Sequence, residues 1–378
     1  MPVMESPPGP RTVIDGREYL YFGGTAYLGL QSHPEVIRAA CEATKRYGIG
    51  SATSRTGYGD TPPTLEAERR LAAFLDREEA FYFASGYAGG SVLMEAAGGF
   101  FDAVFADEFS HYSLFEAIPL AGLPLVTFPH GDADGLRHTI AANLKPRQRP
   151  LVASDGVFSA LGHIAPVADY CRILANYPGS GLLLDDAHGI GVLGKHGRGL
   201  FEYAGLAERV NRDFPPHEGV ESPVLLSCGT CSKALGGFGG VIAGSRTFVA
   251  TVKRAPYYAG ASAPPIPAAA ATARALEILQ SDPSLRLRLQ ENVGALKAGL
   301  ARLGLGVDDS PIPIVCLRIG SADHMRRLHR ELADRGILVP YMAAYSGLGP
   351  EGALRLAIFA NHSREMTEHL LDVLAGLL

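Results

Sequence analysis

Short apolar runs alternate with amphipathic helical patterns through the middle of the chain, between about residues 80 and 243. Seven of these runs are predicted to be strands: Ala80 to Ala84, Ala103 to Ala106, Leu123 to Phe128, Leu151 to Ser154, Leu182 to Asp185, Val224 to Ser227 and Gly240 to Ala243. Strands separated largely by helices are typical of a sheet that is covered on both faces. The pattern therefore predicts the α/β fold class, with a seven-stranded, mostly parallel sheet.

The segments on either side of this alternation have a different character. Residues 11–23 predict a hairpin around Asp15-Gly16, and helices follow over 34–47 and 64–76 with a Gly- and Ser-rich loop between them. After residue 258 the expected elements are helices at 267–280, 283–304, 321–335 and 362–377, and strands at 313–319, 337–340 and 354–359. We therefore expect an N-terminal segment (1–45), a large domain (46–258) and a small α+β C-terminal domain (259–378).

The composition is that of an ordinary globular protein. The chain has 378 residues, of which 47% are hydrophobic and 19% charged, and its net charge is -5. This charge argues against nucleic acid or an anionic membrane surface as a partner. No uncharged apolar segment is long enough to span a membrane, and the first 11 residues lack the basic and apolar parts of a signal peptide.

The five cysteines are scattered along the chain, and an odd, scattered set is no disulfide framework. We therefore expect a reducing, cytoplasmic location. Cys228 and Cys231 have C-x-x-C spacing, which is compatible with redox chemistry or with half of a zinc site. Because no second pair of Cys or His with ligand spacing accompanies them, we predict no metal site.

Lys233 stands in an unusual context for a surface lysine. The apolar run Val224 to Leu226 leads into Ser-Cys-Gly-Thr-Cys-Ser, then Lys233, and then a glycine-rich stretch without a neighbouring carboxylate. A lysine drawn into a partly desolvated pocket has a lowered pKa, and its free amine can form a Schiff base with a carbonyl. The alternative is an ordinary lysine in a turn.

Three further groups of polar residues follow predicted strands. Asp185-Asp-Ala-His188 would emerge at the carboxyl edge of the sheet, where it could bind a metal, cap a turn, or place an aspartate against a heteroaromatic nitrogen. Ser85-Gly-Tyr87 opens a helix whose amides could receive a phosphate, or it is a plain turn. His111 follows the next strand along the chain and could also be merely structural.

Residues Gly189-Ile-Gly-Val-Leu-Gly194 match the G-x-G-x-x-G pattern of dinucleotide-binding folds. That pattern requires a strand that runs directly into the glycines and a helix that begins on them. Here Asp185-Asp-Ala-His188 intervenes, and the residues after Gly194 are not helical in character. A nucleotide-binding α/β protein is therefore kept only as an outside alternative.

A phosphate cradle, an aspartate, a Schiff-base lysine and a histidine are the groups that pyridoxal phosphate requires. With these residues the chain resembles the α-oxoamine synthases, fold-type I pyridoxal-phosphate enzymes that include 8-amino-7-oxononanoate synthase, 2-amino-3-ketobutyrate CoA ligase and serine palmitoyltransferase. The motifs that carry the resemblance are Tyr27-Leu-Gly-Leu30, Ser85-Gly-Tyr87, Ser110-His-Tyr-Ser113, Asp155-Gly-Val-Phe-Ser159, Asp185-Asp-Ala-His-Gly189, Gly197-Arg-Gly199, Thr230-Cys-Ser-Lys-Ala-Leu-Gly-Gly237, Ser262-Ala-Pro-Pro265 and Leu354-Arg355.

The resemblance implies a role for each matching residue. Lys233 would hold the cofactor as a Schiff base, Asp185 would pair with the ring nitrogen, and His111 would stack on the ring. The other residues that would bind the cofactor are His188 and Ser159 near its phenolic oxygen, and Ser85, Gly86, Tyr87 and Thr230 around its phosphate, with Ser262 contributed by a partner subunit. Arg355 would bind the carboxylate of the substrate, and Thr25 stands at the substrate-binding position where the family usually has Asn.

The implied reaction is a decarboxylative condensation of an amino acid with an acyl-CoA, in a homodimer with shared active sites. Lys233 would remove the α-proton, and His111 would assist the carbonyl chemistry. The chain departs from the family at Thr25-Ala26, at Pro62-Pro-Thr64, where a histidine is usual, and at Asp155, where the family has Glu. Most of these positions concern the substrate, so an aminotransferase, an aldolase or another carbon–carbon bond-forming enzyme that does not use CoA remains the alternative.

Overall fold

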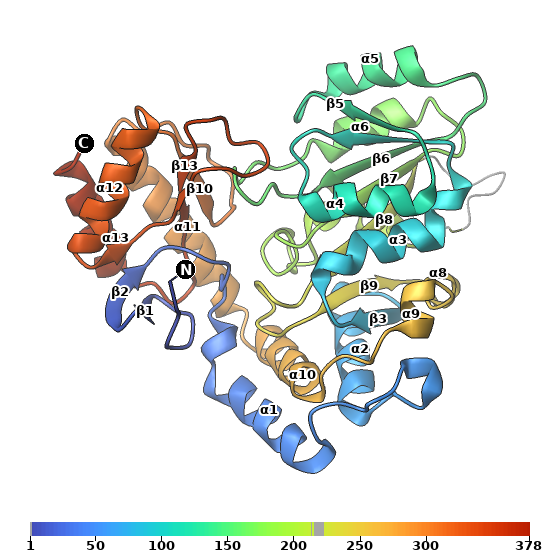
Figure 1. Ribbon diagram of the computed structural model, residues 1–378, viewed down its shortest axis with the longest axis horizontal. Coiled ribbons are helices and arrows are strands. Elements are labelled where there is room, and N and C mark those ends of the chain that lie inside the picture. The colour runs from blue at the N-terminus through green and yellow to red at the C-terminus, as the bar shows by residue number, and fades with distance from the viewer. Residues whose placement is uncertain (1, 213, 215–222) are drawn as a thin grey trace. The chain divides into compact units, whose positions relative to one another are not determined.

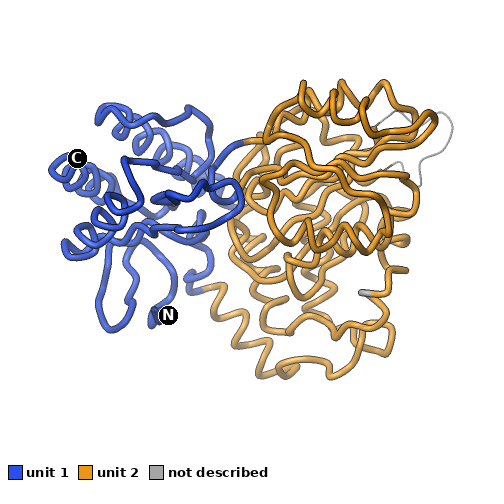
Figure 2. Tube along the Cα trace, turned by 45° about the horizontal axis from the view of Figure 1, so that its top comes forward, with its two compact units in different colours: residues 1–34, 159–163, 281–378 blue, residues 35–158, 164–280 orange. Residues whose placement is uncertain are grey.

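The computed structural model describes residues 2–212, 214 and 223–378, and these residues form two compact units. Figure 2 colours unit 1 (Met1–Pro34, Ser159–His163 and Ser281–Leu378) and unit 2 (Glu35–Phe158 and Ile164–Gln280). The sequence-based domain boundaries at residues 45 and 258 do not coincide with these borders. The N-terminal hairpin joins the C-terminal residues because its second strand pairs with Ile337 and Leu338, and such a distant pairing leaves no local pattern.

Unit 2 contains the seven-stranded sheet that the sequence predicts. Its strands are β3 (Glu79–Phe83), β4 (Ala103–Asp107), β5 (Leu125–Phe128), β6 (Pro150–Asp155), β7 (Gly181–Asp185), β8 (Val224–Thr230) and β9 (Gly240–Gly244). They lie in the order β3-β9-β8-β7-β6-β4-β5 (Figure 1), and the five strands from β8 to β5 are parallel. β9 runs in the opposite direction and is antiparallel to both of its neighbours, β8 and β3. The α/β, mostly parallel fold is confirmed.

Some of the helices that follow pack on this sheet and bury its apolar side chains. The helices are α1 (Pro34–Tyr47), α2 (Pro62–Leu75), α3 (Gly89–Ala97), α4 (Tyr112–Ala117), α5 (Ala133–Asn143), α6 (Val167–Leu174), α7 (Leu200–Tyr203), α8 (Arg246–Val252), α9 (Pro256–Gly260) and α10 (Ile266–Ser281). Short 3₁₀ helices lie at Leu30–Ser32, Arg55–Gly57, Gly86–Ala88, Gly98–Phe100, Ile118–Ala121 and Ala207–Arg209. β4 and β6 are buried along their whole length, as expected for parallel strands between two helical layers.

Unit 1 contains two small sheets. One consists of β1 (Arg11–Ile14), β2 (Arg17–Tyr21) and β11 (Ile337–Leu338), and the other of β10 (Ile314–Leu317), β13 (Ala353–Ala357) and β12 (Tyr341–Met342). The helices are α11 (Ser284–Arg302), α12 (Ala322–Asp334) and α13 (Arg364–Ala375). The hairpin and the helices match the sequence prediction. The predicted strand at 337–340 is shorter, and β12 was not predicted because two residues are too few to show a periodicity.

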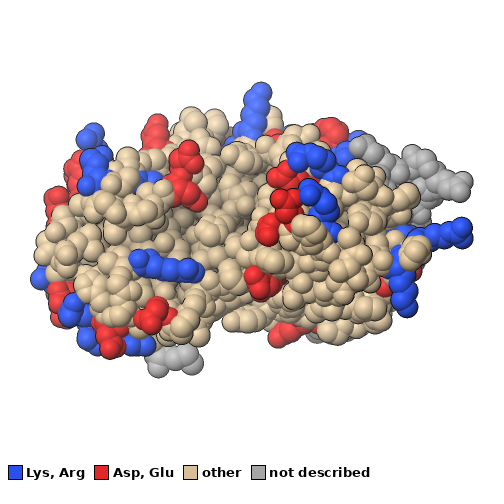
Figure 3. Space-filling view, turned by 90° about the horizontal axis from the view of Figure 1, so that it is seen from above, with Lys and Arg blue, Asp and Glu red and all other residues tan. Residues whose placement is uncertain are grey.

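None of the helices in the described part of the chain is long and apolar enough to cross a membrane. On the face that Figure 3 shows, Lys and Arg side chains lie interspersed with Asp and Glu side chains. Several charged residues of the protein form exposed ion pairs within one helix, such as Arg172 with Asp169 and Arg137 with Asp134. Such pairs contribute little to stability because water already solvates both partners.

A buried ion pair protects the free edge of the large sheet at β3. The Arg55 side chain bonds to both oxygens of Glu68 and also contacts Asp60, and only 4% of the Arg55 side chain and 10% of the Glu68 side chain are exposed. Arg55 also donates to the carbonyl of Tyr82, while Glu68 accepts the amide of Tyr82 at 3.0 Å. The two side chains therefore occupy backbone groups that an edge strand would otherwise leave open to another strand.

Replacing Arg55 should destabilise the protein strongly. Arg55→Ala leaves Glu68 buried without its cation, which typically costs about 3–5 kcal/mol. Arg172→Ala is the matched control, because that ion pair is 75% and 44% exposed and its loss should cost at most about 1 kcal/mol. Equilibrium unfolding in urea measures both changes. Equal losses of unfolding free energy in the two variants would contradict the assigned role of Arg55.

Candidate active site

The topology of the sheet brings several polar residues to one edge. β9 runs antiparallel to both β8 and β3, so β3 points in the same direction as the five parallel strands. The residues that follow the strands of unit 2 therefore gather at the carboxyl edge, where open α/β sheets bind their ligands. They include Ser85 after β3, His111 after β4 and Asp185 at the end of β7. Thr230 is the last residue of β8, and Lys233 follows it by three residues.

The turn after β3 and the end of β8 form a small cradle of donors. Ser85 caps the 3₁₀ turn that leads into α3, and its Oγ accepts the amide of Tyr87 at 3.3 Å. A Cβ atom on Gly86 would collide with the side chain of Thr230, so only glycine permits this approach. Thr230 Oγ1 lies 2.7 Å from Ser232 Oγ. Hydroxyl groups and turn amides beside a helix N-terminus are well suited to a phosphate.

His111 lies at the N-terminus of α4 and is held by several contacts. Its Nδ1 accepts the amide of Ser113 at 3.2 Å, and its ring meets that of Tyr87 edge-on, with 5.8 Å between the ring centroids. The Tyr87 hydroxyl in turn donates to Glu116 at 2.7 Å. Burial lowers the pKa of His111, and the charge of Lys233 acts in the same direction whereas that of Asp185 opposes it. These contacts favour a neutral imidazole ring in a fixed orientation.

Asp185 and Lys233 form the electrostatic centre of the arrangement. Burial raises the pKa of the Asp185 carboxyl, while the positive charge of Lys233 acts against this rise. The Ala187 amide also stabilises the charged form, because it donates to Asp185 Oδ1 at 3.0 Å. His188, three residues after the end of β7, is buried. The residues Ser85, Gly86, Tyr87, His111, Asp185, Thr230 and Lys233 thus lie at or after the carboxyl ends of strands of one sheet, and their roles toward a ligand stay predictions.

Comparisons with known proteins give the chain its relatives. A model of the family "Aminotransferase class I and II" matches residues 17–374. The 8-amino-7-oxononanoate synthase of Methylococcus capsulatus is 36% identical over 374 residues, which cover 99% of this chain and 92% of that protein. The serine palmitoyltransferase of Sphingomonas wittichii, a solved structure, is 26% identical with a TM-score of 0.89, and the match covers 100% of this chain and 91% of the chain of that enzyme. A serine palmitoyltransferase solved with its pyridoxal-phosphate internal aldimine is 25% identical with a TM-score of 0.88, over 100% and 92% of the two chains.

The chain belongs to the α-oxoamine synthase family. It is a transferase that depends on pyridoxal phosphate, as the resemblance of its motifs implied. The donor set at the carboxyl edge fits this cofactor, with a glycine-lined cradle for the phosphate and a partly buried carboxyl for the ring nitrogen. When bound, pyridoxal phosphate supplies an aldehyde that reacts with amines and a ring that accepts electron density from the α-carbon of an amino acid.

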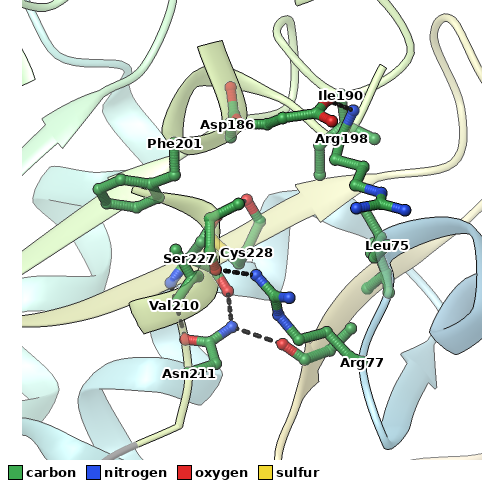
Figure 4. A pocket seen from close by; sticks show the side chains of 14 residues that line it. Leu75, Arg77, Asp186, Ile190, Arg198, Phe201, Val210, Asn211, Ser227 and Cys228 are labelled. Carbon is green, nitrogen blue, oxygen red and sulfur yellow. Dashed lines mark hydrogen bonds between the residues drawn. The ribbon is translucent and has the colours of Figure 1, made fainter. Parts of the chain in front are cut away.

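The second aspartate of the Asp185-Asp186 pair has a separate task in this α-oxoamine synthase. Asp186 Oδ2 accepts the amide of Leu200 at 2.6 Å and would collide with any side chain at Gly199, which has a positive φ of 102°. Asp186 lines a cavity of about 40 Å³ together with Arg198 and other residues (Figure 4). No helix begins over residues 189–194, all of which are described, so the G-x-G-x-x-G match lacks the geometry that dinucleotide binding needs.

The two cysteines that flank the end of β8 are packing residues. Cys228 and Cys231 are both buried and free of disulfides, and Cys228 lies against Gly89 of α3. Burial raises the pKa of both thiols. Because the thiolate is the reactive form of cysteine, neither residue is suited to redox chemistry or metal binding at neutral pH. The described residues contain no group of three or more His, Cys, Asp and Glu that is arranged to hold a metal ion.

The remaining predicted site residues lie elsewhere. Ser262 belongs to unit 2, where it forms an isolated β-bridge with Ser54. Thr25, Ser159 and Arg355 belong to unit 1. Within that unit, Arg355 is buried and donates from Nε to the carbonyl of Ser159 at 2.7 Å and from a terminal nitrogen to the carbonyl of Gly24 at 3.1 Å. Ser159 Oγ in turn donates to the hydroxyl of Tyr345 at 3.3 Å.

Two residues at the carboxyl edge of unit 2 were not assigned from the sequence. Ser232 contacts Thr230, and its position two residues later in a Thr-x-Ser-Lys run is the signal that could have revealed it. Asp155 ends β6, where its Cα is the register partner of Asp185 on the next strand. The sequence marks Asp155 only as a departure from the family pattern, because its neighbour becomes visible only when the strands are paired.

Gly86→Ala should weaken the binding of the cofactor. The added methyl group would push against Thr230 and distort the cradle, and such overpacking costs about 1–3 kcal/mol. This corresponds to a roughly 5- to 150-fold rise in the Kd for pyridoxal phosphate, measured by titrating the apoenzyme and following the visible absorbance of the bound cofactor. Gly99→Ala is the control, since no heavy atom lies within 4 Å of a Cβ at that position. An unchanged Kd in Gly86→Ala would contradict the cradle.

Proposed function

We propose that this α-oxoamine synthase condenses L-alanine with a heptanedioyl thioester, with loss of CO₂, to give 8-amino-7-oxononanoate. The observation that supports this choice is the 36% identity, over nearly all of both chains, to a relative named 8-amino-7-oxononanoate synthase. The product name dictates the substrates. Alanine without its carboxyl supplies carbons 8 and 9 with the amino group, and a dicarboxylic acyl group supplies the other seven carbons with a terminal carboxylate.

In this proposal the residues of unit 2 bind the cofactor and move protons. Ser85, Gly86, Tyr87 and Thr230 hold the phosphate, and Ser232 joins them through its contact with Thr230. Asp185 keeps a proton on the ring nitrogen, because a carboxylate stabilises a neighbouring positive charge. Lys233 Nζ would act as the general base that accepts the α-proton of the amino acid. By the resemblance, His111 would stack on the cofactor ring, and His188 would lie near the phenolic oxygen of the cofactor.

Thr25, Ser159, Ser262 and Arg355 are assigned by the resemblance alone. Arg355 binds the carboxylate of the amino acid, for which a guanidinium offers a two-pronged donor. The contacts with Ser159 and Gly24 fix the plane of that guanidinium. Ser159 acts near the phenolic oxygen of the cofactor, Thr25 contacts the substrate, and Ser262 reaches the site of a partner subunit in a homodimer.

Coenzyme A is the proposed carrier of the acyl group, and the cytoplasm is the proposed location. The reaction requires a thiol as leaving group, which acyl-CoA provides. All five cysteines are free, which supports a reducing compartment.

A second candidate reaction uses serine and a long-chain acyl-CoA. It is supported by the likeness to serine palmitoyltransferase structures, with TM-scores of 0.88 and 0.89.

A panel of substrate pairs tests the proposal. Heptanedioyl-CoA and palmitoyl-CoA are each combined with alanine, glycine and serine, and thiol release and product mass are measured. We expect heptanedioyl-CoA with alanine to give the highest kcat/KM, by about tenfold or more over glycine, because one missing methyl group is worth roughly 10- to 200-fold. Lys233→Ala is the inactive control. A preference for palmitoyl-CoA with serine would establish the second candidate, and no thiol release from any pair would contradict both.

Arg355→Lys should raise the KM for the amino acid by about 10- to 100-fold, the effect expected for losing a hydrogen bond between two charged groups. A lysine keeps the positive charge but cannot bond to Ser159, Gly24 and a carboxylate in the same way. Arg318→Lys is the control, because Arg318 is exposed and donates to the carbonyl of Gly347. Steady-state kinetics with varied amino acid measure both variants. A KM that rises equally in both would contradict the role of Arg355.

A further inference from the structure

Three aspartates follow one another along the carboxyl edge of the large sheet. Asp107 ends β4, Asp155 ends β6 and Asp185 ends β7, and these strands are direct neighbours in the sheet. The Cα atoms of Asp155 and Asp185 are register partners, so these two side chains leave adjacent strands at the same level. A row of carboxyl groups in a buried setting requires protons or positive charges to balance it.

The three carboxyl groups differ in the partners that they receive. Asp107 accepts the amide of Gly131 at 2.8 Å and lies 3.0 Å from Nδ1 of His130. Asp185 has the Ala187 amide and the positive charge of Lys233. Among the described residues, the Asp155 carboxyl receives a single hydrogen bond, from the amide of His111 to Oδ1 at 3.1 Å. Asp155 is therefore the carboxyl of the row with the weakest compensation for a negative charge.

The surroundings of Asp155 act mostly against ionisation. Only 4% of this residue is exposed. Burial raises its pKa well above the usual value, and the neighbouring charges of Asp185 and, to a smaller extent, Asp107 raise it further. The His111 amide and the charge of Lys233 oppose the rise. Lys233 is thus a cation that acts on both Asp155 and Asp185, and one positive charge can balance only one of the two carboxylates.

We propose that Asp155 is a neutral carboxylic acid in the working enzyme, so that Asp185 is the ionised partner of the cofactor ring. Asp155 also positions His111, because its Oδ1 accepts the backbone amide of His111. Asp155 is a positioning residue in this account, since its bond reaches the backbone at the start of α4 and not the reacting atoms. The inference rests on the pyridoxal-phosphate site and is independent of which amino acid and acyl group the enzyme uses.

The neutral form has a consequence for the charge at the ring. If Asp155 and Asp185 were both ionised, two negative charges would face one lysine, and the protonated forms of Lys233 and of the cofactor nitrogen would both be favoured too strongly. With Asp155 neutral, the negative charge is confined to Asp185, opposite the position of the ring nitrogen. The other groups that act on Asp155 are Asp107 at the end of β4, the amide of His111 after β4, and Lys233 after β8.

Infrared spectroscopy of the holoenzyme detects the neutral acid directly. We expect a carbonyl stretching band of a protonated carboxylic acid at neutral pH that is lost in Asp155→Asn. Asp102→Asn is the control, because the Arg149 side chain bonds to that carboxyl and lowers its pKa, so it contributes no such band. Identical spectra for the wild type and Asp155→Asn would overturn the proposal. Because no substrate is present, this result does not depend on the proposed reaction.

A pH titration of the visible absorbance of the bound cofactor separates the charge of Asp155 from its shape. Asparagine matches a neutral acid, since it offers an acceptor to His111 and a donor elsewhere. We expect the titration midpoint of Asp155→Asn to stay within about 0.3 pH unit of the wild type. Removal of a nearby negative charge would instead lower the midpoint by about one unit or more. A shift of that size would show that Asp155 is ionised and would overturn the proposal.

Asp155→Ala tests the bond to His111. The variant removes the acceptor, so kcat/KM should fall about 3- to 10-fold, as expected for one hydrogen bond, and the visible circular dichroism of the bound cofactor should change. Asp155→Asn should restore both readouts, and far-ultraviolet circular dichroism checks the fold of each variant. Equal losses in Asp155→Asn and Asp155→Ala would overturn the positioning role.

Discussion

The placement of the partly buried Asp185 carboxyl beside the positive charge of Lys233 is the interaction on which the active site of this α-oxoamine synthase depends. A carboxylate that loses its water needs a cation or several donors, and here the Ala187 amide and Lys233 provide them. β7 ends at Asp185, whose register partner on β8 is Cys228, five residues before Lys233. The pairing of two central strands therefore fixes where the carboxylate stands, and only a short turn separates it from the amine.

The phosphate cradle depends on a different constraint, the stability of an edge strand. β3 has a neighbour on one side only, yet it leads into Ser85, Gly86 and the N-terminus of α3. The Arg55–Glu68 pair bonds to the backbone of Tyr82 within this strand and so replaces the missing neighbour. This ion pair thus stabilises the strand that leads into the turn at Gly86, where the chain approaches Thr230 closely.

The sequence was sufficient for features that repeat locally or carry a motif. Seven apolar runs predicted seven strands, and ordered motifs predicted the family and its cofactor, all of which are confirmed. The features that escaped prediction depend on pairing between distant residues. Arg55 lies in a Gly- and Ser-rich stretch that gave no sign of a buried cation. Asp155 and Asp185 are 30 residues apart in the chain, and only the register of β6 and β7 makes them neighbours.

The sequence also contained no indication of how residues are divided between the two units. Ser159 follows a strand of unit 2 in the chain, and its motif resembles the cofactor-binding motifs, yet residues 159–163 belong to unit 1. The reason is physical, because the carbonyl of Ser159 accepts a hydrogen bond from Arg355, a bond that spans nearly 200 residues of sequence. A backbone carbonyl has no side-chain identity, and a sequence pattern therefore gives no indication of its partner.

Substrate choice follows different energetics from cofactor binding. An apolar site discriminates poorly against an amino acid that merely adds a hydroxyl group, and the two kcat/KM values then differ by only about 100-fold. A comparison of alanine with serine therefore separates the two candidate reactions only weakly. A terminal carboxylate on the acyl chain is different, since a site built to bind that carboxylate would leave its own polar groups unpaired with an acyl donor that lacks it, and the loss of kcat/KM would be far larger. The acyl donor is consequently the substrate whose identity distinguishes the two candidate reactions most sharply.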